Sequence, residues 1–316
     1  MKTLVIGAGG MLGRKLVERL DGEPTLHDVV DFEARGRKVV SDLSAPGVAE
    51  ALVAERPQLI FHLAAVVSGE AEADFEKGYR VNLDGTRLLF EAIRRAGGGY
   101  RPRVVFASSI AVFGAPFPEA IGDEFLSAPL TSYGTQKAIG ELLLADYSRR
   151  GFFDGVGIRL PTVCVRPGRP NKAASGFFSG IIREPLNGEQ AILPVPASVR
   201  HWFASPRAAV GFLLHAASMP TSALGERRSL TMPGICATVA EQIEALRKVA
   251  GEKAVQLIRR QPDETIMRIV AGWPQNFDPQ RALALGFRAD PSFEEIIRIH
   301  IADELQKSPP PRQARA

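Results

Sequence analysis

The stretch TLVIGAGGMLGRKLVERL, residues 3–20, decides the fold of this chain of 316 residues. An apolar run that predicts a buried strand leads into Gly7, Gly10 and Gly13, and apolar residues at helical spacing follow. In such a GxxGxxG loop, the glycines permit a tight turn, let a pyrophosphate approach the backbone, and let helix and strand pack closely. The stretch therefore predicts a dinucleotide site that includes Met11 and Leu12 at the start of the helix; a purely structural turn is the alternative.

Apolar runs and amphipathic stretches alternate through the first half of the chain. Further strands are predicted in PTLHDVVD, RKVVSDL, PQLIFHLAA, RVVFASS and DGVGIRL, and helices in GVAEALVAE, VNLDGTRLLFEAIRRAGGG and SYGTQKAIGELLLADY. Strands rich in Val, Ile and Leu that alternate with helices indicate a parallel sheet with both faces covered. We therefore expect an α/β fold with a doubly wound parallel Rossmann sheet.

The pattern loosens after about residue 165, which predicts a smaller, mixed α/β C-terminal part that binds the substrate. The segment RPGRPNKAASGFFSG, residues 166–180, is typical of a loop, whereas residues 238–250 and 292–306 carry apolar stripes typical of helices. The domain boundaries that we expect are a dinucleotide-binding Rossmann domain over 1–165 with a return at about 204–234, a substrate-binding part over 166–203 and 235–307, and a disordered tail over 308–316.

The composition limits the classes of function. Apolar residues make up 45% and charged residues 23% of the chain, and the net charge of +4 is spread along it, so nothing suggests a nucleic acid or membrane partner. No apolar run approaches the roughly 20 residues that a bilayer span needs. Cys164 and Cys236 lack metal-ligand spacing, and the histidines form no metal pattern. We expect a cytoplasmic protein with free thiols, no metal and a small-molecule substrate.

An acid after the second strand of a dinucleotide fold accepts hydrogen bonds from the adenosine ribose. Asp28 and Asp31 both qualify, and Asp28 is preferred because it ends the alternating run TLHD. A carboxylate here repels the 2′-phosphate of NADP, which favours NAD as the cofactor. Asp42, beside Leu43 after the third strand, either contacts the adenine or caps the following helix.

Tyr133 and Lys137 are four residues apart on a predicted helix and therefore lie on one face. A nearby ammonium stabilises a phenolate, which would let tyrosine act as a base near neutral pH. A hydroxyl is then needed to hold the substrate oxygen. Ser108 and Ser109 end the fifth strand, at the edge of the sheet where ligands bind in open α/β folds.

The segments GAGGMLG, FHLAA, VNLDGT, FASSIAVFG and YGTQK resemble the extended short-chain dehydrogenase/reductase family, over residues 1 to about 235. The resemblance implies an NAD(P)-binding Rossmann domain and a triad of Ser109, Tyr133 and Lys137, with Ser109 rather than Ser108 as the triad serine. The same resemblance implies further cofactor contacts from Leu63, Ala64, Ala65, Asn82, Pro161 and Val163.

The C-terminal half departs from the pattern of the nucleotide-sugar enzymes in this family. Where these enzymes carry acidic positions, the segment RHWFASPRAAV, residues 200–210, has His201 and Arg207, which suits a small anionic substrate. We expect Arg200 or Arg207, with Asn171, to bind its carboxylate, and Ser68 to contact a hydroxyl.

Several segments, SPRAAV among them, resemble the members of the family that oxidise D-erythronate, a four-carbon sugar acid, at C2. The resemblance implies that NAD⁺ is the oxidant and 2-oxo-tetronate the product. The alternatives are a nucleotide-sugar 4-epimerase or dehydratase, a dehydrogenase of another small hydroxy substrate such as a threonine-like amino acid, or a non-enzymatic family member. Family members often pair through the helix of Tyr133 and the preceding long helix, so a homodimer is possible.

Overall fold

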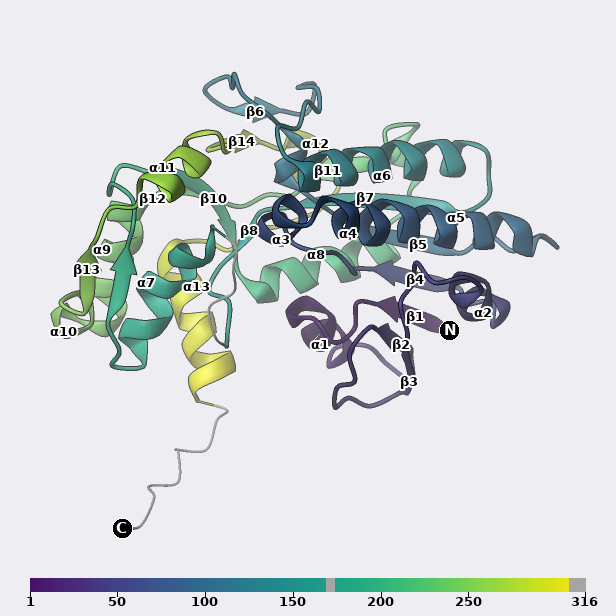
Figure 1. Ribbon diagram of the computed structural model, residues 1–316, viewed down its shortest axis with the longest axis horizontal. Helices are drawn as coiled ribbons and strands as arrows, with labels where there is room; N and C mark the ends of the chain where they lie inside the picture. Colours follow the sequence, from purple (N-terminus) through teal and green to yellow (C-terminus); the bar gives the residue numbers. More distant parts are fainter. Residues whose placement is uncertain (169–173, 307–316) are drawn as a thin grey trace, which may run out of the picture.

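The computed structural model describes residues 1–168 and 174–306. Its centre is a seven-stranded sheet in the order β11-β7-β5-β4-β1-β2-β3, in which each neighbouring pair is parallel (Figure 1). The doubly wound parallel sheet expected from the sequence is confirmed. Its strands are β1 (Thr3–Ile6), β2 (Thr25–Asp28), β3 (Arg37–Val40), β4 (Leu59–His62), β5 (Arg103–Ser109), β7 (Asp154–Leu160) and β11 (Ser229–Thr231).

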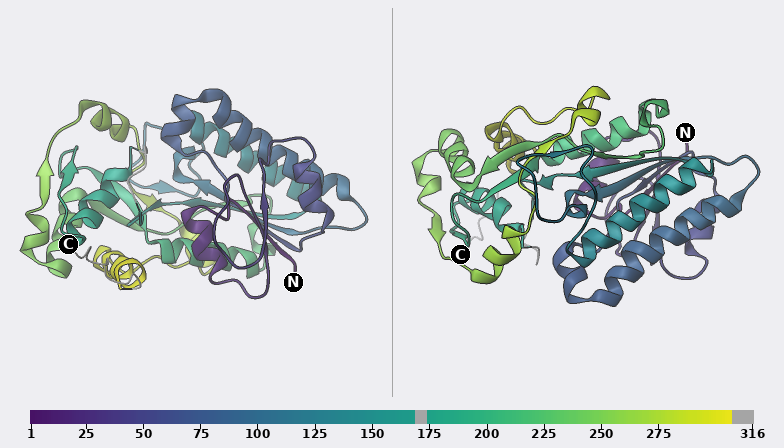
Figure 2. Two further views of the ribbon diagram at one scale, coloured as in Figure 1. Left: turned by 60° about the horizontal axis from the view of Figure 1, so that its bottom comes forward. Right: turned by 90° about the horizontal axis from the view of Figure 1, so that it is seen from above.

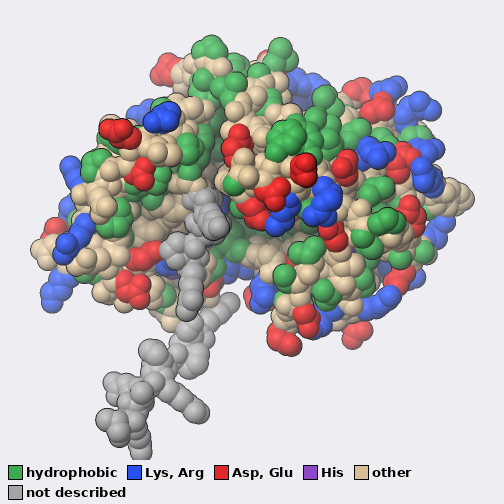
Figure 3. Space-filling model, viewed as in Figure 1, with side chains coloured by type: hydrophobic (Ala, Val, Ile, Leu, Met, Phe, Trp, Pro, Cys, Tyr) green, Lys and Arg blue, Asp and Glu red, His purple; other side chains and the backbone are tan. Residues whose placement is uncertain are grey.

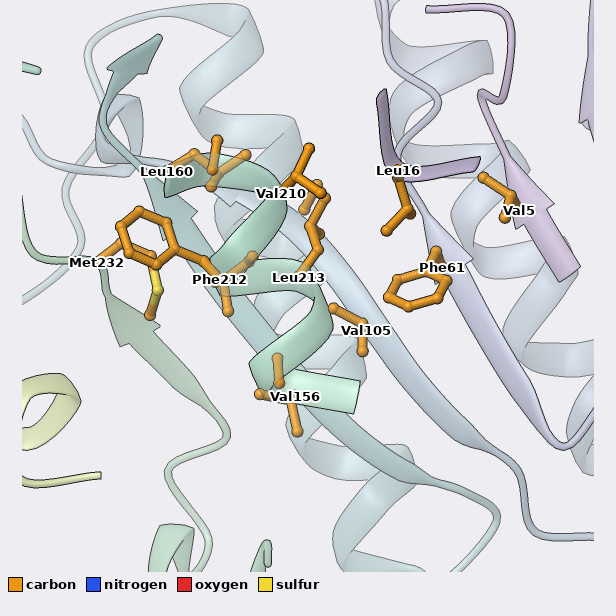
Figure 4. Packing of buried hydrophobic residues seen from close by; sticks show 14 of the residues in the cluster. Val5, Leu16, Phe61, Val105, Val156, Leu160, Val210, Phe212, Leu213 and Met232 are labelled. Carbon is orange, nitrogen blue, oxygen red and sulfur yellow. The ribbon is translucent and has the colours of Figure 1, made fainter. Parts of the chain in front are cut away.

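One face of the sheet is covered by α1 (Met11–Val17) and α8 (Pro206–Ser218). Ser205 begins α8 by accepting a hydrogen bond of 2.9 Å from the Ala208 N–H, and Pro206 follows where the helix needs no N–H donor. Figure 4 shows sheet residues packed against residues of these two helices. The labelled residues that make this contact are Val5, Phe61, Val105 and Val156 of the sheet with Leu16, Val210, Phe212 and Leu213 of the helices.

The opposite face is covered by α2 (Val48–Ala54), α5 (Gly85–Ala96) and α6 (Ser132–Arg149). Leu52, Phe90 and Leu144, one from each helix, are buried there against sheet residues. Strands that are buried on both faces need near-continuous apolar runs, which is why LVI and LIF stand out in the sequence. The short elements on this side are α3 (Ser68–Ala73), α4 (Phe75–Gly78) and the π-helix η1 (Tyr79–Asp84).

The strand order changes direction between β1 and β4. From β1 the chain continues outward to β2 and β3, whereas from β4 it continues the other way to β5 and β7. In open α/β sheets, ligands bind outside the carboxyl ends of the strands at such a switch point. The glycine loop after β1 and the HLAA loop after β4 lie at this point.

The remaining elements gather mainly at one end of the molecule, beside the sheet (Figures 1 and 2). They have their own apolar core, in which Phe178, Phe203, Leu246 and Ile297 are buried. The strands here are β8 (Thr162–Val163), β9 (Ala191–Leu193), β10 (Arg200–Ala204), β12 (Ile235–Thr238) and β13 (Ile258–Arg260). The helices here are α7 (Gly176–Leu186), α9 (Val239–Ala250), α10 (Glu252–Val255), α11 (Glu264–Ala271), α13 (Phe293–His300) and the π-helix η4 (Ile301–Leu305).

The loop expected over residues 166–180 is too long, because α7 begins at Gly176. Phe178, Ile181 and Ile182 of this helix are fully buried in the second core, and this packing outweighs the local glycine and serine content. Within the expected return over 204–234, α8 packs on the sheet and β11 pairs with β7. The exact domain boundaries stay a prediction, and the tail over 308–316 lies outside the described residues.

Both cysteines are free thiols, and Cys164 is buried. No helix within residues 1–168 and 174–306 is long and apolar enough to cross a membrane, and the same residues form no metal-binding group of His, Cys, Asp and Glu. On the face seen in Figure 3, basic and acidic side chains are interspersed. The small elements are the 3₁₀-helices η2 (Ile110–Val112) and η3 (Ser222–Leu224), the paired strands β6 (Ile121–Gly122) and β14 (Phe277–Asp278), and α12 (Gln280–Ala284).

Candidate active site

A cavity of about 460 Å³ lies at the carboxyl ends of β1, β4, β5 and β7 and extends to the second core. Many of the residues predicted for the cofactor and the triad line this cavity. They are Gly7, Gly10, Met11, Leu12, Gly13, Leu63, Ala65, Ser68, Ser109, Tyr133, Lys137, Pro161 and Val163. Asp28, Asp42, Leu43, Ala64, Asn82, Arg200 and Arg207 do not line it, and Asn171 lies outside the described residues.

The glycine loop has the geometry that a pyrophosphate needs. Gly7 has a φ of +85°, and a Cβ there would lie 2.5 Å from the Ala64 nitrogen. A Cβ on Gly13 would lie 2.2 Å from the Gly7 carbonyl oxygen, so only glycine lets α1 pack this closely on β1. The cradle at the N-terminus of α1 therefore fits a dinucleotide.

Asp28 is tied to the glycine loop. Its Oδ2 accepts a hydrogen bond of 2.8 Å from the Gly9 N–H, and its Oδ1 accepts one of 2.8 Å from the Val29 N–H. Asp31 instead forms an ion pair of 2.8 Å with Lys38, and its side chain is 71% exposed. Of the two acids, Asp28 is the one held next to the phosphate-binding loop.

Asp42 is already engaged by neighbouring groups. Its Oδ1 accepts hydrogen bonds of 2.9 Å from the Ser44 N–H and 2.6 Å from the Ser44 hydroxyl, and its Oδ2 pairs with Arg80. Leu43 beside it is buried against α2 and α5. These contacts form a local turn at Ser44 and not a helix cap, because α2 begins after Gly47 without a side-chain cap. The capping alternative for Asp42 is therefore wrong, and adenine contact stays a prediction.

Asn82 fixes the loop after β4 that leads to Ser68, the first residue of α3. Its side chain accepts a hydrogen bond of 2.7 Å from the Val66 N–H and donates one of 2.9 Å to the Val66 carbonyl. It also donates one of 2.7 Å to Gln136 of α6, and both side chains are buried. Asn82 thus couples the loop after β4 to the helix of Tyr133, without facing the cavity itself.

Ser109, Tyr133 and Lys137 meet in the cavity. Ser109 is the last residue of β5, and α6 begins at Ser132 after Thr131, whose hydroxyl accepts a hydrogen bond of 3.1 Å from the Gly134 N–H. Lys137 follows one helical turn after Tyr133, and its Nζ lies 5.8 Å from the tyrosine ring centroid. The three side chains thus come from the end of a strand and the first turns of one helix.

The electrostatics around Tyr133 have three named contributors. Burial raises the pKa of the Tyr133 phenol, and a hydrogen bond with Ser109 and the Arg166 guanidinium both oppose that rise. Burial lowers the pKa of Lys137 to about 8, while the Glu141 carboxylate opposes this. Positive charge beside a phenol favours the phenolate, which is the form that a base requires.

Glu141 and Arg159 form an ion pair next to Ser108, the neighbour of Ser109. Glu141 is 6% exposed, accepts a hydrogen bond from the Ser108 hydroxyl of 2.5 Å, and binds Arg159 through an Nη2–Oε2 contact of 2.6 Å. Ser108, although it lines the cavity, is thus engaged by Glu141, while Ser109 interacts with Tyr133. This difference agrees with the choice of Ser109 as the triad serine.

Two arginines line the cavity, Arg166 and Arg183, and neither is among those expected to bind a carboxylate. Arg166 lines the cavity near Tyr133, and within the described chain no carboxylate pairs with it. Arg200 is exposed on β10, and Arg207 is an exposed residue that pairs with Asp303 at 2.7 Å. Arg183 also lines the cavity but pairs with Glu184. Arg200 and Arg207 therefore do not face the cavity as expected, and Arg166 becomes the candidate for binding a carboxylate there.

Three further residues of the second part face the cavity. Thr162 begins β8, just after β7; His201 lies on β10; and Trp273 follows α11. None of the described lining residues is an aspartate or a glutamate. The charged side chains of this wall are therefore basic, as an anionic ligand requires.

Comparison with known proteins agrees with this geometry. The chain is 48% identical to a D-erythronate dehydrogenase from Cupriavidus necator, across 96% of this chain and 98% of that one, and 41% identical to one from Haemophilus influenzae, across 96% and 100%. A crystal structure of a protein from Agrobacterium tumefaciens, described as a nucleoside-diphosphate-sugar epimerase, is 64% identical over 98% of this chain and 95% of that one, with a TM-score of 0.94. The model of the NAD dependent epimerase/dehydratase family matches residues 3–213. The chain therefore belongs to this family, the extended short-chain enzymes that its motifs resemble.

Proposed function

We propose that this chain, an NAD-dependent dehydrogenase, oxidises the C2 hydroxyl of D-erythronate to give 2-oxo-tetronate. The observation that carries the substrate class is the cavity in which Ser109, Tyr133 and Lys137 lie near Arg166, with no carboxylate among the described lining residues. This charge distribution suits a small hydroxy acid and disfavours the ammonium group of an amino acid. The two curated relatives that match almost the full length support D-erythronate in particular.

Tyr133 is the base of the proposed mechanism. Its phenolate takes the proton of the C2 hydroxyl, and Ser109 donates a hydrogen bond to the same oxygen. NAD⁺, when bound, accepts the hydride from C2. The proton therefore stays at Tyr133 Oη, and Ser109 keeps the oxygen within reach while the carbonyl forms.

Lys137 has two tasks in this mechanism. Its ammonium favours the Tyr133 phenolate and would hold the ribose next to the nicotinamide. The Nζ donates a hydrogen bond of 2.8 Å to the Ala107 carbonyl and lies 4.9 Å from the Phe106 ring centroid, so its position is fixed. The glycine loop and Asp28 would hold the pyrophosphate and the adenosine ribose of NAD.

Arg166 binds the substrate carboxylate. A guanidinium can hold a carboxylate through two parallel hydrogen bonds, which fixes orientation as well as position. The Arg166 Nε already donates to the Val163 carbonyl at 3.2 Å, and its backbone N–H donates to the Ser179 hydroxyl at 3.0 Å. An anchor held in this way would place C2 beside Tyr133, because carboxylate and C2 are directly bonded.

The experiment that tests the proposal incubates the purified protein with D-erythronate and NAD⁺ and follows the absorbance of NADH. We expect steady NADH formation with D-erythronate and much less with L-threonine. Absence of NADH formation with D-erythronate contradicts the proposal.

A nucleotide-sugar 4-epimerase is the second candidate, because the Agrobacterium tumefaciens structure at 64% identity carries the description of such an enzyme. An epimerase restores its NAD in every turnover and releases no net NADH. Conversion of UDP-glucose to its 4-epimer without NADH release would favour this candidate, and the same protein preparation serves both assays.

We further propose the assembly, location and domain division of the protein. A homodimer would form through α5 and α6, where Leu142 of α6 is 70% exposed. Light scattering of the purified protein tests the dimer, and cell fractionation tests the cytoplasmic location. Residues 1–165 with 204–234 would bind NAD, and residues 166–203 with 235–307 would bind the substrate.

A further inference from the structure

Thr162 and His201 form a hydrogen bond in the cavity that the mechanism above does not use. Thr162 Oγ1 lies 2.6 Å from His201 Nε2, and both residues line the cavity. Thr162 begins β8, and His201 lies on β10, the strand that pairs with β8 through Phe203 and Thr162. The contact is therefore fixed by strand pairing rather than by a chance meeting of two loops.

The His201 ring is held rigid and neutral. It is 2% exposed and stacks on Phe178 with ring centroids 5.2 Å apart and an interplanar angle of 2°. The Trp273 ring lies 5.4 Å from it on the cavity wall. Burial lowers the pKa of His201 to about 4, so the imidazole carries no charge near neutral pH. A fixed neutral ring holds the Thr162 oxygen in place.

The Thr162 hydroxyl can bind a ligand hydroxyl in either tautomer of His201. When the imidazole N–H donates to Thr162, the hydroxyl proton is free to donate to a ligand. When Thr162 donates to the imidazole, its remaining lone pair accepts from a ligand. A ligand hydroxyl is both donor and acceptor and matches both arrangements, whereas a carboxylate matches only the first.

Thr162 is close in the chain to both groups that would hold the other end of the substrate, and all three residues line the same cavity. Ser109, which holds the C2 oxygen, is paired in the sheet with Leu160, two residues before Thr162. Arg166, which binds the carboxylate, follows four residues after Thr162 and lines the same cavity. A four-carbon acid bound by both groups would direct its remaining carbons toward the wall that Thr162, His201 and Trp273 form.

We propose that Thr162, oriented by His201, binds a hydroxyl at C3 or C4 of the sugar acid. The pair then makes the enzyme selective for polyhydroxy acids over simple 2-hydroxy acids. A half-buried hydroxyl whose position is fixed disfavours a substrate that cannot supply it with a hydrogen-bond partner. This inference rests on the proposed function, from which it takes the acid and its C2 chemistry, and it adds the recognition of the rest of the molecule.

The test compares D-erythronate with 2-hydroxybutanoate of the same C2 configuration, which has the same four carbons but lacks the C3 and C4 hydroxyls. Thr162→Val keeps the side-chain shape and removes the hydroxyl. We expect kcat/KM for D-erythronate to fall about 10- to 100-fold and that for 2-hydroxybutanoate to change less than about threefold. The preference of the wild type for D-erythronate would thereby collapse.

Three further variants separate recognition from structure. Thr162→Ser keeps the hydroxyl and is expected to keep the preference, and His201→Phe keeps a ring against Phe178 but is expected to weaken it. Thr25→Val makes the same replacement on β2, outside the cavity, and is expected to change neither constant. If Thr162→Val does not fold, the serine and phenylalanine variants decide the question between them.

Each result has a distinct meaning. Wild-type protein that forms no NADH with either acid contradicts the proposed function. Wild-type protein that prefers D-erythronate, together with a Thr162→Val variant that keeps this preference or loses both activities equally, contradicts the inference about Thr162 alone.

Discussion

Lys137 Nζ donates a hydrogen bond of 2.8 Å to the backbone carbonyl of Ala107, two residues before Ser109 at the end of β5. The bond holds the ammonium of α6 against the strand that carries the serine. The lysine is 2% exposed, and burial lowers its pKa from 10.5 to about 8. The fold thus retains a buried cation that is unfavourable for stability, as expected for a residue kept for its role in the proposed mechanism.

Lys137→Met should make the protein more stable near neutral pH while it abolishes activity. The lowered pKa of Lys137 corresponds to a cost of about 3 kcal/mol for the charged group. The variant also loses the hydrogen bond to Ala107, which reduces the gain. We therefore expect the free energy of unfolding of Lys137→Met to be about 1–3 kcal/mol higher than that of the wild type.

Lys137 binds its proton more tightly in the unfolded chain than in the folded protein, and this difference sets the sign of the pH effect. The cost is fully present below about pH 8 and disappears as the pH approaches 10.5, where Lys137 is neutral in both states. Urea unfolding of both proteins at several pH values between these limits measures the difference. A methionine variant that is less stable than the wild type below pH 8 would show that this cost is absent.

Tyr133→Phe should reduce NADH formation by about three orders of magnitude or more, because no other residue of the triad can take the proton in its place. The ring remains, so the fold and the affinity for NAD should change little. NADH formation and NAD titration by calorimetry check the two statements separately. Turnover close to that of the wild type would be incompatible with a tyrosine base.

Arg166→Ala should raise KM for D-erythronate about 10- to 100-fold, since it removes a charged pair with the carboxylate. Arg166→Lys should recover only part of the loss, because an ammonium lacks the planar fork. Arg207→Ala and Arg200→Ala are matched controls on exposed residues outside the cavity. If Arg207→Ala raises KM and Arg166→Ala does not, the assignment of the carboxylate site is wrong.

Asp28→Asn should shift cofactor preference from NAD⁺ toward NADP⁺, because the variant removes the charge that repels a 2′-phosphate. The amide can still accept the hydrogen bond from the Gly9 N–H, so the glycine loop should keep its position. Asp31→Asn removes the same charge three residues away and should leave the preference unchanged. The ratio of kcat/KM for the two cofactors is the measurement, and an equal ratio for both variants would leave no special role for Asp28.

The sheet could be predicted because its strands are buried on both faces and the helices between them have one apolar face. The helix α7 could not, since Pro167, Gly168 and Gly176 resemble a loop locally while Phe178 and Ile181 are recruited by a core built from distant segments. Sequence periodicity records local burial and contains little information about packing between elements that are far apart in the chain.

The meeting of Ser109, Tyr133 and Lys137 in one cavity could be predicted from residue types in a fixed order, whereas the arginines that line this cavity could not. The catalytic roles of the three residues stay a prediction. Arg166, Arg200 and Arg207 are indistinguishable as sequence letters, and only strand pairing and ion pairs decide which one faces the cavity. One signal was available for Arg166: it follows the sixth strand closely, at the carboxyl end where ligands bind. The Thr162–His201 contact had no such signal, because the pairing of β8 with β10 joins segments almost 40 residues apart.

The late return of β11 to the sheet has a consequence for recombination between relatives. A fragment that ends near residue 165 would carry the glycine loop and the whole triad, yet it would leave β7 as an open edge and expose the apolar surface that α8 covers. Such a fragment should self-associate. A chimaera made by a single crossover near residue 165 would place α8 and β11 of one relative against the sheet of the other, so it would exchange sheet contacts together with the cavity residues that follow.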